Sequence, residues 1–152
     1  MEIMEKEGYK FSLLGSLMTI GLAIVTLIST FILFEVEGIS IGSFQIFQIT
    51  ILIVSGMVIP GIIFLLSFLG EKHYLKSKNI PLIFGIVIIA LSTIVIIISG
   101  IWIEYMIPYA QAFGSPLGPP ITIIVCLFLA ICPLLICIYG GAQNIIYWTK
   151  NK

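Results

Sequence analysis

Arginine and aspartate are absent from the 152 residues, and His73 is the only histidine. Without aspartate, no Ser-His-Asp arrangement exists. One histidine cannot supply the converging ligands of a catalytic zinc or iron site. A haem bound within a helical bundle takes axial ligands from inside the spans, whereas His73 stands in a polar stretch. The sequence therefore predicts a non-catalytic protein with no bound cofactor or metal.

Charge of either sign is scarce. Only 9% of the residues are charged and 60% are hydrophobic, and the mean hydropathy is +1.23. Soluble domains carry about 25% charged residues, so this chain lacks the polar surface that water requires. The seven lysines are too scattered to form a basic patch, which excludes nucleic acid as a partner. The solvent, and the first partner, is predicted to be a lipid bilayer.

Cysteine is also rare, and its placement is informative. Cys126, Cys132 and Cys137 all fall within one apolar run. An odd number of cysteines in a single helix does not make a disulfide framework. We therefore interpret them as small hydrophobic packing residues.

What the chain does have is four long apolar runs. Each has 20 or more residues, the length at which a helix crosses about 30 Å of hydrocarbon. Only helices and closed barrels can span, and the ten-residue alternation of barrel strands is missing. The sequence predicts an all-α membrane protein with a single domain, residues 1–152, folded as an up-down-up-down bundle. The expected spans are residues 11–34, 45–69, 81–103 and 120–148.

The lysines indicate an orientation. All seven lie before the first run, between the second and third, or after the fourth; none lies in the other two connections. A random distribution would be this one-sided about once in sixty times, so the positive-inside rule places both termini in the cytoplasm. We expect a multi-pass protein of a cell membrane. The Ile-rich, Lys-only composition favours a prokaryote or a viral envelope.

Aromatic residues and prolines mark the ends of the spans. Aromatic side chains gather at both boundaries and are typical of aromatic belts, so we interpret them as interfacial anchors. They are Trp102, Tyr105 and Tyr109 at one boundary and Tyr9, Phe11, Tyr74, Tyr147 and Trp148 at the other. Residues 105–119 contain three prolines and several apolar side chains. We expect this segment to be an irregular loop that covers the membrane surface and offers a partner surface.

Small and weakly polar residues recur at helical spacing in every run. In membranes such stripes mark the faces where helices pack. The alternative is a narrow polar path along the bundle axis. The stripes are Ser12, Gly15, Thr19, Ala23, Thr26 and Thr30; Gly56, Pro60, Ile63, Ser67 and Gly70; Gly85, Ser92 and Ser99 with Thr93 and Gly100 beside them; and Thr122, Cys126, Ala130, Pro133, Cys137, Gly140 and Asn144.

One group of residues is the candidate polar site or packing face: Glu104, Ser92, Ser99, Thr122 and Asn144. Glu104 is the charge nearest to the middle of a span, and an intramembrane charge is a functional hypothesis by default. The leading prediction is a subunit or structural component of a larger membrane assembly, through other subunits or self-association. The alternatives are a small oligomeric transporter or channel that uses these five residues, and an accessory subunit of a membrane redox complex.

Overall fold

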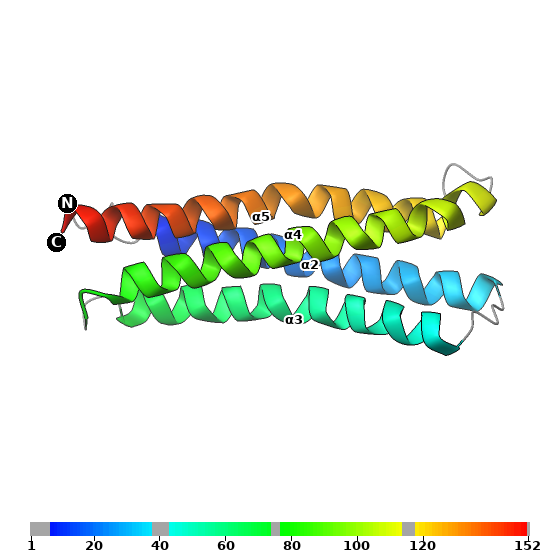
Figure 1. The fold of residues 1–152 in the computed structure, drawn as a ribbon, viewed down its shortest axis with the longest axis horizontal. Coiled ribbons are helices and arrows are strands. Elements are labelled where there is room, and N and C mark those ends of the chain that lie inside the picture. The colour runs from blue at the N-terminus through cyan, green and yellow to red at the C-terminus, as the bar shows by residue number, and fades with distance from the viewer. Residues whose placement is uncertain (1–6, 38–42, 74–76, 114–117, 152) are drawn as a thin grey trace.

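Four long helices form the protein in the computed structural model, which describes residues 7–37, 43–73, 77–113 and 118–151 (Figure 1). They are α2 (Glu7–Glu37), α3 (Ser43–His73), α4 (Ile80–Phe113) and α5 (Pro119–Lys150). Each has 31 to 34 residues and is long and apolar enough to cross a membrane. Neighbouring helices run in opposite directions, and the start of α2 lies at the same end of the bundle as the end of α5. The predicted all-α, four-span bundle is confirmed.

The helices are not packed equally tightly. α5 packs extensively along both α2 and α4, whereas α3 makes fewer contacts with the same two helices. The most tightly held core therefore follows α5, and the space beside α3 is looser. This asymmetry determines where cavities occur.

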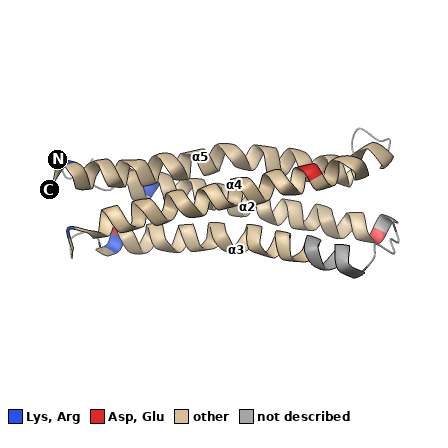
Figure 2. Cartoon of the chain, viewed as in Figure 1, with Lys and Arg blue, Asp and Glu red and all other residues tan. Residues whose placement is uncertain are grey.

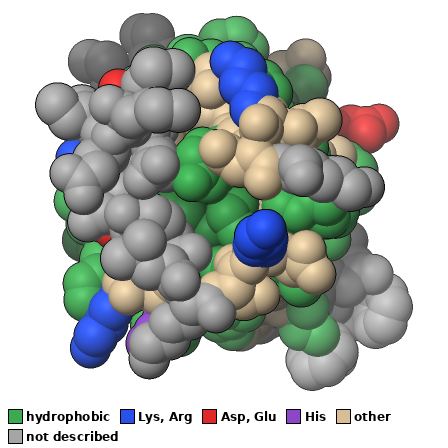
Figure 3. Space-filling view, turned by 90° about the vertical axis from the view of Figure 1, so that its left-hand side faces the viewer, with side chains coloured by type: hydrophobic (Ala, Val, Ile, Leu, Met, Phe, Trp, Pro, Cys, Tyr) green, Lys and Arg blue, Asp and Glu red, His purple; other side chains and the backbone are tan. Residues whose placement is uncertain are grey.

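The described lysines gather at one end of the bundle (Figure 2), whereas glutamates occur toward both ends, with Glu7 and Glu71 near the lysines. Among the described lysines, Lys10 follows the start of α2, Lys72 closes α3, Lys78 precedes α4 and Lys150 ends α5, so all four share the end where α2 begins and α5 ends. Figure 3 looks onto this end, where lysine side chains lie around a central area of hydrophobic side chains. We call it the lysine end, and the opposite end, which holds Glu35, the glutamate end.

The third span is longer than predicted. α4 continues ten residues beyond Ile103 to Phe113, passing through Pro108. We expected residues 105–119 to be an irregular loop, and this prediction is wrong for residues 105–113, which are helical. Residues 114–117 lie outside the described residues. A proline removes one backbone donor, and neighbouring helices let a membrane helix tolerate that loss. The extension adds roughly 15 Å of helix beyond the expected span.

The predicted packing faces are largely confirmed. On α5, six of the seven predicted positions are buried: Cys126, Ala130, Pro133, Cys137, Gly140 and Asn144. Their steps of four and three keep them on one face. On α4 the prediction is correct for Ser92 and Ser99 but wrong for Thr93 and Gly100, which are exposed. Consecutive helix residues are about 100° apart, so these pairs point in different directions.

Two adjacent glycines of α5 serve two different helix contacts at the lysine end. A Cβ atom on Gly140 would lie 2.5 Å from the carbonyl oxygen of Gly8 on α2. A Cβ atom on Gly141 would lie 2.9 Å from the carbonyl oxygen of Gly85 on α4. Backbones can come this close only where side chains are missing. The Gly140–Gly141 pair thus lets α5 fit closely between α2 and α4.

Two of the expected membrane anchors are core residues instead. Trp102 is 2% exposed and packs with Leu33, Met106 and Ile123, and Tyr9 is 1% exposed. The belt interpretation is therefore wrong for Trp102 and Tyr9. Position within a span fixes the depth of a side chain but not its direction around the helix, and both rings point inward.

Candidate functional site

The structure separates the five candidate residues. Ser92 and Ser99 of α4 and Asn144 of α5 are buried, whereas Thr122 and Glu104 are exposed. Glu104 follows Ser99 by five residues, which is about 140° around the helix. Its carboxylate therefore does not share the inward face with the serines. No single polar site contains all five residues.

Most of the buried hydroxyls bond within their own helix. Thr19 donates to the carbonyl oxygen of Gly15, Thr26 to Leu22 and Ser92 to Ile88, each at 2.8 Å. This bond from a hydroxyl to the fourth residue back is a common way to satisfy Ser and Thr inside a helix. Because the protons of these hydroxyls point to the backbone, the stripe of hydroxyls is a packing surface rather than a row of free donors.

One polar contact joins two helices directly. The Ser12 hydroxyl donates to the carbonyl oxygen of Cys137 at 3.4 Å, and the Cys137 thiol donates to the carbonyl oxygen of Ser12 at 3.5 Å. Gly15, one turn along α2, lies against the same part of α5. The role of Cys137 is therefore to pack and bond α5 against α2. Cys126 is also buried, Cys132 is exposed, and all three thiols are free.

Two polar tips are buried without a partner near the lysine end. The Asn144 side-chain nitrogen and the Tyr9 hydroxyl form no hydrogen bond with the described residues. Asn144 lies against Gly8 and Gly85. The Tyr9 ring lies over Gly70 and meets Phe84 edge to face, with ring centroids 6.3 Å apart. Asn144 therefore joins helices through close packing and not through a hydrogen bond from its side-chain nitrogen.

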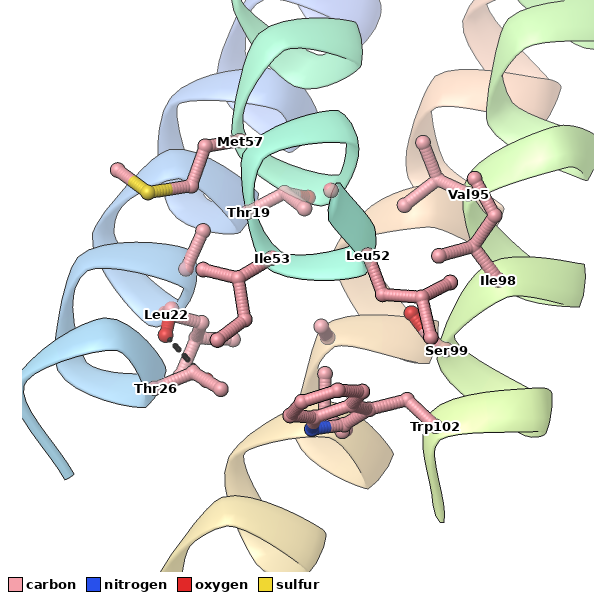
Figure 4. A pocket seen from close by; sticks show the side chains of 14 residues that line it. Thr19, Leu22, Thr26, Leu52, Ile53, Met57, Val95, Ile98, Ser99 and Trp102 are labelled. Atoms are coloured by element: carbon pink, nitrogen blue, oxygen red, sulfur yellow. Dashed lines mark hydrogen bonds between the residues drawn. The ribbon is translucent and has the colours of Figure 1, made fainter. Parts of the chain in front are cut away.

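A partly open cavity of about 50 Å³ lies between the helices, toward the glutamate end (Figure 4). Residues of all four helices line it, including Thr26, Gly56, Trp102 and Ala130. Figure 4 shows Ser99 and Trp102 projecting from α4 into this space. The Trp102 indole nitrogen is buried and has no hydrogen-bond partner among the described residues. Of the predicted site residues, only Ser99 lines this cavity.

Sequence reasoning missed Trp102 as a cavity residue. A tryptophan near the end of a span is the usual signature of an interfacial anchor. The signal that could have revealed it is its spacing, since Trp102 follows Ser99 by three residues and therefore lies about 60° from it.

A second hollow opens between α2 and α3. Its volume is about 430 Å³, and its lining includes Leu27, Thr30 and Phe34 of α2 with Thr50 and Ile53 of α3. Ile53 also lines the inner cavity. The side chain of Ile53 therefore borders both spaces, on the less tightly packed side of the bundle. We call the outer one the α2/α3 cleft.

No family model, curated protein or solved structure matches this chain. Its class therefore comes from its own fold, which is that of a helical multi-pass membrane protein built as a four-helix bundle.

Proposed function

We propose that the protein is a non-catalytic subunit of a larger membrane assembly, and that it binds its partner through the outward face of α4. The observation that supports this is a second small-residue stripe on that helix. Ala90, Thr93, Gly100 and Glu104 are all exposed and recur in steps of three, seven and four, so they share one face. We call it the α4 outer stripe.

The α4 outer stripe lies among large exposed side chains, since Ile86 and Ile97 of the same face are 54% and 56% exposed. Exposed positions on α2 are mostly large, such as Leu17, Ile28 and Phe31, which suits contact with lipid chains. A Cβ atom placed on Gly100 would meet nothing within 4 Å, so the stripe has room for an approaching helix. Small residues let helix backbones come close in a membrane, where lipid is as apolar as leucine.

Glu104 gives the stripe a polar end. From Lys10 to Glu35, α2 spans 25 residues, roughly 37 Å, which exceeds the hydrocarbon thickness by a few ångströms at each side. Lys10 and Glu35 therefore lie at the two membrane boundaries. Glu104 lies nearer to the middle of the bundle than Glu35 (Figure 2), on the exposed side of α4, where a partner amine or amide could pair with its carboxylate. With the lysine end in the cytoplasm, as the positive-inside rule requires, this pairing would take place on the outer side of a cell membrane.

The close packing of the lysine end supports a structural role over transport. Gly8, Gly85, Gly140 and Gly141 leave no space there for even a methyl group, and buried hydroxyls are occupied within their helices. The candidate transport residues also fall on different faces. This geometry therefore favours a rigid bundle that binds a partner through one face over a transporter.

Site-specific crosslinking tests the proposal. A photoreactive residue at position 100 should give a discrete protein adduct in native membranes, identified by mass spectrometry as another subunit or a second copy. The matched control is position 65 on α3, where Leu65 is 55% exposed to the surroundings of the bundle. That position should yield lipid adducts only. Lipid adducts alone at position 100, together with a single-chain particle on a native gel, would contradict the proposal.

A further inference from the structure

Glu104 is the member of the α4 outer stripe that close packing of small residues does not explain. Its side chain is exposed on the outward side of α4, and it forms no ion pair or hydrogen bond with any described residue. It is also the only charged residue in the membrane-spanning stretch Ile80–Ala112. Charged side chains within membrane spans almost always pair with another group. Glu104 therefore indicates that another molecule supplies a cation on the outward side of α4.

The chain itself offers no such cation. Its lysines and its single histidine all lie in residues 1–10, 71–79 or 150–152, and arginine is absent. The described lysines share the lysine end, near the start of α4. From Ile80 to Glu104 there are 24 residues, or roughly 36 Å along the helix. No lysine of the same chain therefore reaches the Glu104 carboxylate.

A second copy of the chain does not supply the cation either. In a two-fold pair formed through the α4 outer stripe, the same patch of both copies meets, so the two Glu104 carboxylates would face each other. Like charges repel, and they do so more strongly away from water. The one-sided lysines also give every copy the same orientation, so an inverted copy cannot bring its lysine end to Glu104. Self-association through this face therefore adds repulsion and no pairing.

We propose that the partner at the α4 outer stripe is a membrane-spanning helix of a different protein, with a lysine or arginine at the level of Glu104. Gly100, one turn from Glu104, leaves room for that helix, since a Cβ atom there would meet nothing within 4 Å. The ion pair fixes the position of the partner along α4 and selects it over a second copy. This inference rests on the function proposed above and goes further by stating the chemistry of the partner.

The crosslinked peptide identifies the occupant of the face. With the photoreactive residue at position 100, the expected adduct in native membranes joins this chain to a different protein. The crosslinked helix should carry a lysine or arginine within about one turn of the attachment point. An adduct of two copies, or a partner helix without a basic residue there, would overturn the inference and leave the proposed function standing. Lipid adducts alone would remove both.

Charge variants test the pairing itself. At low expression, where adduct yield follows affinity, Glu104→Gln should lower the yield about tenfold or more, because it leaves the partner cation unpaired. The matched control is Glu35→Gln, which neutralises an exposed glutamate of α2 and should leave the yield unchanged. Glu104→Lys should abolish the adduct, and changing the basic residue of the partner to glutamate should restore it. That restoration would also show that Glu104→Lys is folded.

Two results of the charge variants would overturn the inference. Equal yields in Glu104→Gln and Glu35→Gln would show that the Glu104 carboxylate contributes nothing to partner binding. Failure of the exchanged charges to restore the adduct would show that the basic residue of the partner does not pair with position 104.

Discussion

Replacing Gly140 by alanine is the most direct test of how the lysine end is built. The added Cβ would lie 2.5 Å from the carbonyl oxygen of Gly8 and 2.7 Å from the amide nitrogen of Ser12. Ordinary contact begins at 3.4 Å. The Ser12 hydroxyl oxygen lies closer still and could rotate away, but the other two neighbours are backbone atoms of α2. The two helices must therefore move apart by up to about 0.9 Å if they are to relieve the contact.

The cost of that movement can be estimated. A radial gap of 0.5–1 Å forfeits about a quarter to a half of the dispersion energy of the contacts that it opens. The Ser12–Cys137 hydrogen bonds, already 3.4 and 3.5 Å long, would stretch further. Overpacking of this kind costs about 1–3 kcal/mol. We therefore expect Gly140→Ala to be less stable by that amount than a variant with the same chemical change in open space.

Gly21→Ala is that matched variant. It lies on the exposed face of α2, and its Cβ would meet nothing within 4 Å. Both variants gain the same helix propensity from alanine, so their difference isolates the clash. The assay is reversible unfolding in mixed micelles, followed by circular dichroism as the fraction of denaturing detergent rises. Equal stability of the two variants would refute the close packing of α5 on α2.

Three further predictions use the same unfolding assay or chemical labelling. Tyr9→Phe removes a buried hydroxyl with no partner among the described residues, so stability should stay level or rise by about 1 kcal/mol, and a clear loss would reveal a bound partner. Ser12→Ala removes an interhelical hydrogen bond and should cost about 0.6 kcal/mol, whereas Ser92→Ala, whose hydroxyl bonds within α4, should cost less; the reverse order would contradict the assignment. With the native cysteines replaced, an impermeant maleimide applied to intact cells should label Glu35→Cys and not Lys78→Cys, and the opposite pattern would invert the orientation.

The fold could be predicted from the sequence because lipid leaves few choices. Runs of 20 or more apolar residues must be helices in a bilayer, and the small residues of α5 recur at steps that only one helix face can satisfy. The exact end of α4 could not be predicted in the same way. Prolines and glycines between residues 105 and 119 favour a loop, but the structure continues the helix to Phe113 through Pro108.

Direction around a helix was harder to predict than depth. α4 has small residues on two faces, since Ser92 and Ser99 point inward while Thr93 and Gly100 point outward. When small residues are adjacent in the sequence, their spacing does not predict which of the two faces packs against the other helices. For the same reason the sequence predicted Trp102 to be an interfacial anchor, although its ring is buried in the core.

The buried polar groups divide according to whether they can reach their own backbone. A serine or threonine hydroxyl can donate to the carbonyl four residues earlier, so a stripe of them is satisfied wherever the helix is buried. The polar tips of Tyr9, Trp102 and Asn144 extend away from the helix that carries them, and all three remain without a partner among the described residues. At the lysine end the glycines bring the backbones together around Asn144, so its orphaned nitrogen reflects close packing. Trp102 differs from Tyr9 and Asn144 in that its residue also lines a cavity, together with Ser99, so close packing alone does not account for its unpaired nitrogen.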